Sequence, residues 1–168
     1  TAYAAVILSD TTLAAATLNA LNDNTTGAID ASTVTTLTGA AADANTTFAA
    51  GKDGHITNLG NEAVTLNDTS LATATLNTLN DNTTGAVDAT TLMTITGSAA
   101  HVNTAYTAGI ASEIIGLGNE AVTLDDTTLA VTTLNTLDSN TTGTIDATTV
   151  TKLTGSASDV NSAYASGG

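Results

Sequence analysis

The residues best suited to chemistry form a short loop that occurs three times along the chain. In the middle occurrence, Asn80-Asp-Asn-Thr-Thr-Gly-Ala-Val-Asp88, oxygen-bearing side chains stand at alternate positions around Gly85. Carboxylate, amide and hydroxyl oxygens are the ligands that calcium takes from proteins. The candidate ligands of the three loops are Asn22, Asn24, Thr26 and Asp30; Asn80, Asn82, Thr84 and Asp88; and Asp138, Asn140, Thr142 and Asp146.

This loop resembles the twelve-residue calcium loop of EF-hand and dockerin proteins. The glycine falls on position 6, Ile or Val on position 8, and oxygen-bearing residues on positions 1, 3, 5 and 9. Position 12 departs from the family, because it holds Thr33, Thr91 or Thr149 instead of a bidentate acid. The resemblance therefore implies calcium as the one candidate cofactor, weakly bound, with the third loop as the best site.

A turn between two helices explains the same residues without a metal. The glycine would end one helix in the left-handed conformation, Asn and Thr would form the turn, and Asp88 would cap the next helix. This interpretation accounts for every residue except the full coincidence of spacing. We favour it and keep calcium binding as the alternative.

The loops belong to a tandem repeat, whose equal steps are marked by Asp10, Asp68 and Asp126 (68 − 10 = 126 − 68 = 58). The copies run over residues 5–62, 63–120 and 121–168, the third is truncated, and residues 1–4 are an N-terminal remnant. We expect the ends to be cut from a longer array or trimmed by design. A lone copy has too few large apolar side chains to offset the ordering of its backbone, so stacked copies should form one continuous solenoid.

The apolar spacing predicts an all-α fold, a helical solenoid of three 58-residue repeats with about three short helices per repeat. In the second copy, the first helix follows Asp68, the second follows Asp88 and ends at Gly97, and the third opens at Ser98. Residues 121–124 are expected to be extended, and residues 156–159 to form a capping box. The predicted inward side chains include Leu71, Ala72, Leu76, Leu79, Leu92, Ile95, Ala99, Val102, Tyr106 and Tyr164.

Two further sets of polar residues recur with the period. Asn19, Asn77 and Asn135 follow an inward Leu, so their side chains either bond across the stack or face solvent. Glu62 and Glu120 stand at the repeat junctions. Paired carboxylates can carry out acid–base catalysis, but a charge in a junction turn is the simpler interpretation.

Composition excludes several classes of function. The net charge is −14 with only 2 Lys and Arg residues, which argues against nucleic acid as a partner. No apolar stretch is long enough for membrane insertion, and the absence of cysteine excludes disulfides and thiolate metal sites. Because no catalytic constellation recurs, we do not expect an enzyme.

The segment from Leu134 to Asp146, continued from Val150 to Gly155, resembles the Ala/Thr-rich tandem repeats of very large exported bacterial proteins, cyanobacterial ones among them. This resemblance implies an extracellular or cell-surface location. We predict a structural or adhesive repeat module, acting as a rod-like spacer or self-associating scaffold. Its partners would be neighbouring repeats of a longer array and, end to end, further copies. The alternative is a calcium-responsive binding module that uses the loops.

Overall fold

Short helices alternate with short strands in the computed structural model, which describes residues 4–166. The helices are α1 (Ala15–Asn24), α2 (Ala41–Lys52), α3 (Thr73–Asn82), α4 (Ala99–Ile110), α5 (Val131–Asn140) and α6 (Ala157–Ser166). The strands are β1 (Val6–Ile7), β2 (Thr12–Ala14), β3 (Ile29–Asp30), β4 (Thr36–Gly39), β5 (Ile56–Thr57), β6 (Ala63–Leu66), β7 (Ser70–Ala72), β8 (Val87–Asp88), β9 (Thr94–Gly97), β10 (Ile114–Ile115), β11 (Ala121–Leu124), β12 (Thr128–Ala130), β13 (Ile145–Asp146) and β14 (Lys152–Thr154).

All strand pairs are parallel and join successive coils, where a coil is one strand–helix stretch of the chain. The sheets have the orders β1-β3-β5, β10-β8-β6-β4-β2, β13-β11-β9-β7 and β12-β14. In the second sheet, for example, Thr36 pairs with Thr12 on one side and with Ala63 on the other. Every strand therefore pairs with strands of adjacent coils, and the inner strands of each sheet have partners in both the preceding and the following coil.

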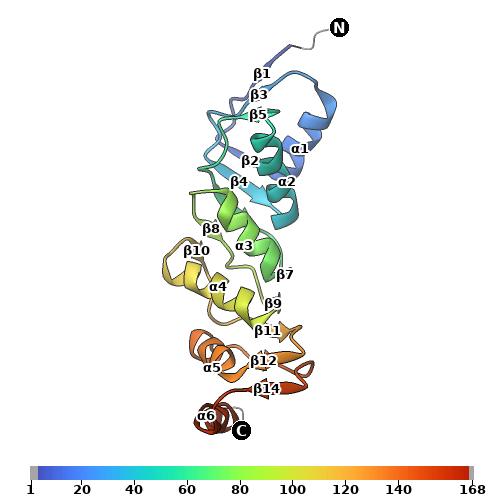
Figure 1. The fold of residues 1–168 in the computed structure, drawn as a ribbon. Coiled ribbons are helices and arrows are strands. Elements are labelled where there is room, and N and C mark those ends of the chain that lie inside the picture. The colour runs from blue at the N-terminus through green and yellow to red at the C-terminus, as the bar shows by residue number, and fades with distance from the viewer. Residues whose placement is uncertain (1–3, 167–168) are drawn as a thin grey trace.

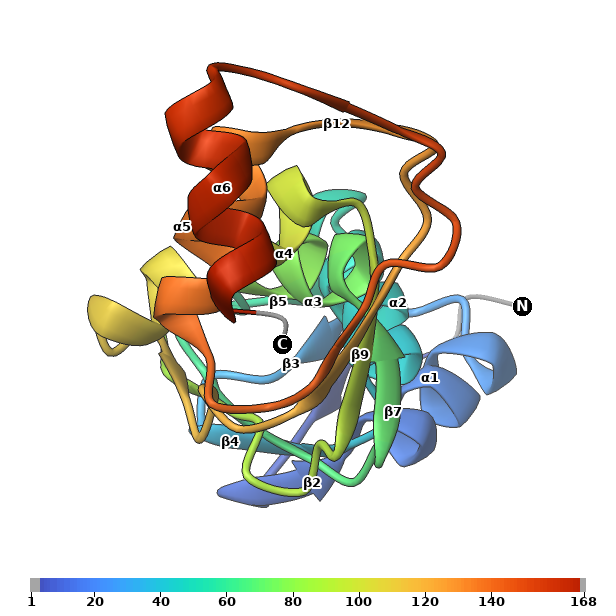
Figure 2. The ribbon, with the colours of Figure 1, turned by 90° about the horizontal axis from the view of Figure 1, so that it is seen from below.

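The coils stack into an elongated molecule whose two ends lie at opposite poles (Figure 1). The helices form one column in which each contacts the next from α1 to α6, and in this view the column passes from the right at the top to the left at the bottom. Seen along the long axis, the helices also turn around that axis (Figure 2). The result is a twisted α/β stack.

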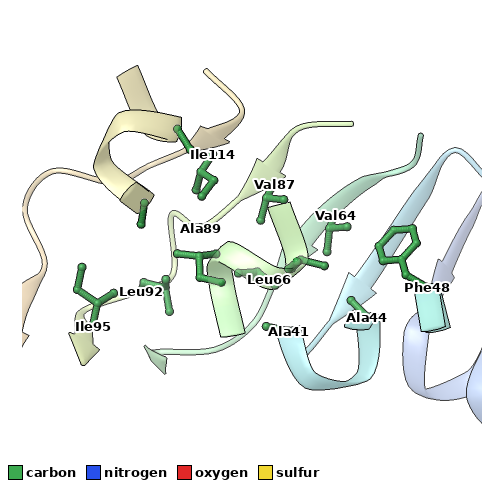
Figure 3. Packing of buried hydrophobic residues seen from close by; sticks show 14 of the residues in the cluster. Ala41, Ala44, Phe48, Val64, Leu66, Val87, Ala89, Leu92, Ile95 and Ile114 are labelled. Atoms are coloured by element: carbon green, nitrogen blue, oxygen red, sulfur yellow. The ribbon is translucent and has the colours of Figure 1, made fainter. Parts of the chain in front are cut away.

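One apolar core runs between the helices and the sheets through successive coils (Figure 3). Helix α2 contributes Phe48, strand β6 contributes Val64 and Leu66, and the next coil continues with Val87 and Ile95, all of them buried. Inward and outward side chains alternate along the longer strands, as expected where one face of a sheet covers a core. No coil has a core of its own.

The predicted all-α fold is wrong: the protein is a mixed α/β structure with two helices per full copy instead of three. Residues 88–97, predicted as the second helix, form β8, a turn and β9. This stretch is dense in β-branched residues, which favour strands, and Ile95 pairs with Leu71 on one side and Val122 on the other. Leu71 and Ala72, predicted on the first helix, belong to β7.

Other local predictions are confirmed. Helix α4 begins after Ser98, whose hydroxyl accepts a hydrogen bond from the backbone N–H of His101, and Val102 and Tyr106 are buried in it. Residues 121–124 form β11. The Ser156 hydroxyl accepts from the backbone N–H of Asp159, as in the expected capping box, but the Asp159 carboxylate accepts from the Ser156 hydroxyl instead of from its backbone N–H. Tyr164 is an exception, because it is exposed instead of buried.

Equivalent elements recur once in every copy. Helices α1, α3 and α5 begin at residues 15, 73 and 131, and helices α2, α4 and α6 begin at residues 41, 99 and 157. Each predicted copy thus contains two coils with one helix each. Of the predicted N-terminal remnant, residues 1–3 lie outside the described part of the chain, as do residues 167–168 of the third copy.

Candidate functional site

The three loops proposed to bind calcium each connect a helix to a strand. Asn80 and Asn82 lie in the last turn of α3, Thr84 lies in the turn, and Asp88 lies on β8. An EF-hand places a helix on both sides of its loop. The helix predicted on the second side is a strand in all three copies, so this part of the resemblance is wrong.

Several loop side chains already have partners within the protein. Asp88 accepts a hydrogen bond at 3.0 Å from the backbone N–H of Thr90, and Asp30 and Asp146 make the same turn. This backbone bond is the main cause that lowers the pKa of Asp30 and of Asp146. The hydroxyl of Thr91, at position 12, lies 2.8 Å from the carbonyl oxygen of Asp68 in the preceding coil.

The amides at position 3 of the second and third loops point away from the turn. Asn82 donates to the side-chain oxygen of Asn45 on the preceding helix, and Asn140 donates to that of Asn103. Within residues 4–166, no group of three or more His, Cys, Asp or Glu residues is close enough to hold a metal ion. The twelve residues are thus spread over helix ends, turns and strands, and calcium binding stays a prediction.

Close backbone packing explains the glycine of the second and third loops, and the alignment with an EF-hand calcium loop does not. A Cβ atom on Gly85 would collide with the backbone carbonyl of Glu62, and one on Gly143 would collide with that of Glu120. Neither glycine has a positive φ, so neither ends a helix in the left-handed conformation. The glycine therefore allows the junction backbone of one coil to pass against the turn of the next.

The junction glutamates are buried. Glu62 and Glu120 are each 1% exposed. One carboxylate oxygen of Glu120 accepts from the backbone N–H of Gly118 at 2.9 Å and from the Tyr106 hydroxyl at 3.3 Å. The other oxygen of each glutamate is buried without a protein partner among the described residues. These carboxylates hold the connector before β6 and β11 against the core.

The side chain of Tyr106 reaches this junction from α4. Burial raises the pKa of its phenol to about 12, and the neighbouring Glu120 carboxylate also disfavours the phenolate. In the first copy the equivalent residue is Phe48, which is buried to a similar degree and has no hydroxyl. The aromatic ring is thus common to both junctions, whereas the hydroxyl bond is particular to one.

A regular ladder of asparagines joins all six helices. The fifth residue of each helix is Asn, and from α1 to α5 its side-chain N–H donates to the backbone carbonyl of the third residue of the next helix at 3.0 or 3.1 Å. The donors are Asn19, Asn45, Asn77, Asn103 and Asn135, and the acceptors are Asp43, Thr75, His101, Thr133 and Asp159. Of the two roles left open for Asn19, Asn77 and Asn135, the bond across the stack is the observed one.

Two of the aspartates that mark the repeat, Asp68 and Asp126, each cap a helix of the preceding coil. The carboxylate of Asp68 accepts from the backbone N–H of Ala41 at 2.8 Å, and Asp126 accepts from Ala99 at 2.7 Å. These bonds satisfy the first N–H of α2 and α4, which lie N-terminal to the aspartate by 27 residues. These two aspartates therefore cap the helix of the preceding coil and not the helix that follows them in the sequence.

Sequence reasoning missed two of the five donors in the asparagine ladder, Asn45 and Asn103. Asn45 and Asn103 occupy equivalent places in successive copies, as do Asp68 and Asp126, so the period itself carried the signal. What it did not reveal was which helix each side chain reaches.

Comparison with protein-family models, curated proteins and solved structures finds no match for this chain. In the part of the chain that the structure describes, no helix is long and apolar enough to cross a membrane.

Proposed function

We propose that this chain is a stiff spacer segment of an exported or cell-surface bacterial protein and that its role is mechanical. The proposal rests on one observation, the asparagine ladder that links every helix to the next over the whole length of the molecule. A bend between any two coils would break a ladder bond and expose shared core. Resistance to bending is the property that a spacer requires.

The surface of the rod suits this role. The chain carries a net charge of −14, which keeps separate molecules apart in dilute solution and opposes collapse of the rod onto itself. The extracellular or cell-surface location rests only on the sequence resemblance to exported repeat proteins. An adhesive role would need a ligand, and the resemblance names none.

A calcium-responsive binding module is the weaker proposal. It is supported by the recurrence of Asp30, Asp88 and Asp146 at the same position of each loop. Against it, the loop carboxylates accept backbone bonds and two of the amides at position 3 bond to neighbouring helices. Titration calorimetry with calcium separates the two proposals, because a spacer should give no heat at millimolar calcium.

The spacer proposal is tested by measuring distances between equivalent positions. Thr12, Ser70 and Thr128 are exposed and occupy the same place in the three copies, and the chain contains no natural cysteine. Cysteine pairs introduced at positions 12 and 70, and at positions 12 and 128, can therefore be labelled with dyes for single-molecule energy transfer. We expect narrow distance distributions, with the second distance close to twice the first.

Flexible coupling of the copies would give a different result. In a flexible chain the mean distance grows roughly as the square root of its length, and the distribution is broad. Such a result would refute the spacer proposal. The same measurement repeated with calcium tests whether the metal changes the spacing of the copies.

A further inference from the structure

The backbone bonds that hold one coil on the next run along the long axis of the molecule. All strand pairs join successive coils, and the coils lie one above another along that axis (Figure 1). Between the coils of α2 and α3, for example, β3 pairs with β5 over two residues and β4 pairs with β6 over four. The strands therefore run across the axis, and a pull along the axis acts in the direction of their hydrogen bonds.

Side chains also connect each coil with the next. Asn45 donates to the carbonyl of Thr75 on the following helix, and Asp68 caps Ala41 of the preceding coil. The chain contains no cysteine, so no disulfide ties one coil to another. Each interface between coils is thus held by a short row of hydrogen bonds and by the apolar core that the coils share.

The direction of the backbone bonds decides how they break under tension. When two paired strands are pulled along their length, all the bonds between them carry the load together. When one strand is pulled away from its partner at one end, the bonds carry the load one after another and break singly, at a lower force. Tension along this molecule acts in the second way, because it pulls a coil away from its neighbour.

The coils that remain after one has peeled away keep their own pairing. Strand β4, for example, pairs with β2 as well as with β6, so the loss of β6 leaves the β2–β4 pair in place. Its free edge then presents hydrogen-bonding groups that are already arranged for the lost strand. Because coils that are adjacent in the stack are also adjacent in sequence, re-pairing requires only a short loop to close.

We propose that this molecule is an extensible element, which lengthens coil by coil under tension along its axis and shortens again when the tension falls. Stiffness against bending does not require this property, so the proposal goes beyond the spacer role. Thr12 pairs with Thr36 and Thr36 with Ala63, so one coil takes 24 or 27 residues (36 − 12 and 63 − 36). Each step should release about 85–95 Å of extended chain.

The test stretches the full chain between optical traps through peptide tags fused to its two ends. We expect a series of steps of one coil each during stretching, and the same steps in reverse during relaxation. The last two coils should be lost together in one larger step, because a single copy lacks a core of its own. A single rupture that releases the whole chain would overturn the proposal, and so would steps that do not reverse while more than two coils remain.

A reversible crosslink between two coils assigns the steps. Thr38→Cys combined with Thr65→Cys places cysteines at paired positions of β4 and β6, where neither side chain is buried. Neighbouring strands lie about 4.8 Å apart, a distance that a disulfide spans. Since the chain has no natural cysteine, the same protein serves as its own control when it is reduced. Circular dichroism checks that both forms are folded.

The oxidised and reduced forms should differ by one step. The disulfide keeps residues 39–64 from extending, so the oxidised form should lack one step of coil size, and reduction should restore it. If oxidation shortens the final length without removing a step, extension does not proceed coil by coil and the proposal is overturned.

The spacer proposal and this one can fail separately. The distance measurements between labelled copies are made without load, whereas the steps appear only under tension. A molecule that is stiff at rest and ruptures in one event is a spacer without extensibility. Broad distance distributions at rest would refute the spacer role even if the chain extended in steps.

Discussion

At the scale of single residues, the junction between copies depends on buried polar groups. One carboxylate oxygen of Glu120 accepts hydrogen bonds from the Gly118 N–H and the Tyr106 hydroxyl. The backbone carbonyl of Glu120 lies so close to Gly143 that a Cβ atom would not fit there. A buried donor or acceptor without a partner costs about 1–3 kcal/mol, so removing either side of such a bond is expensive. This makes the junction sensitive to changes that a surface turn would tolerate.

Stability at high pH should depend on Tyr106. The pKa of its phenol is raised to about 12 in the folded protein, above the ordinary value of 10.0. The residue therefore favours the folded state fully below about pH 10, and this contribution is lost as the pH rises from about 10 to about 12. Urea unfolding at several pH values should show a steeper loss in wild-type protein than in Tyr106→Phe.

The Tyr106→Phe variant is a fair control because Phe48 occupies the equivalent buried position. Absorbance titration of the phenols gives an independent measurement. We expect the component near pH 12 to be absent from the variant. If the titration curve keeps that component, the assignment of the raised pKa to Tyr106 is wrong.

At the scale of elements, the helices and strands obtain caps and hydrogen-bond partners from adjacent coils. Helices α1, α3 and α5 have no side-chain cap at their N-terminal residue, and α2 receives its cap from an aspartate of the next copy. Helices this short are marginal alone in water. Contacts with adjacent coils therefore supply what each element lacks.

Loss of a cap should destabilise a different coil from the one that carries the substitution. Asp126→Ala removes the acceptor for the Ala99 N–H, so we expect faster hydrogen exchange in the first turn of α4 and a loss of about 1 kcal/mol in stability. Asp125→Ala is the control, because it changes the charge equally at the neighbouring exposed residue. Equal exchange in both variants would argue against the capping role.

At the scale of the whole molecule, the continuous core makes the copies depend on one another. The buried set runs from Ala15 on α1 to Leu137 on α5 as one cluster. In repeat proteins of this kind, stability is roughly the sum of weak units and favourable interfaces between them. A middle copy has an interface on each side, and isolation removes both.

A single copy should accordingly fail to fold cooperatively. We expect the segment from Ala63 to Glu120 to show little cooperative thermal unfolding by circular dichroism, and the full chain to melt in one transition. A segment of residues 63–168 provides an intermediate case with one more interface. A well-folded single copy with a sharp transition would contradict the dependence on stacking.

The sequence by itself determined the features that depend on local or periodic information. The equal spacing of equivalent residues, the start of α4 after Ser98 and the inward positions of Leu76, Leu79 and Val102 were all predictable. These depend on a cap next to its helix, or on apolar residues within two helical turns. These relations involve residues that lie close together in the sequence.

Only the tertiary structure decided the fold class and the partners of the polar side chains. The strands are only two to four residues long, too short for an alternation of apolar and polar residues to predict them from the sequence. They exist because partners on adjacent coils, such as Val64 for Leu37, supply their hydrogen bonds. The same step from coil to coil lets Asp68 cap α2 and lets Asn77 reach α4. The period was visible in the chain, but the pairing that it produces arises only when one coil is placed on the next.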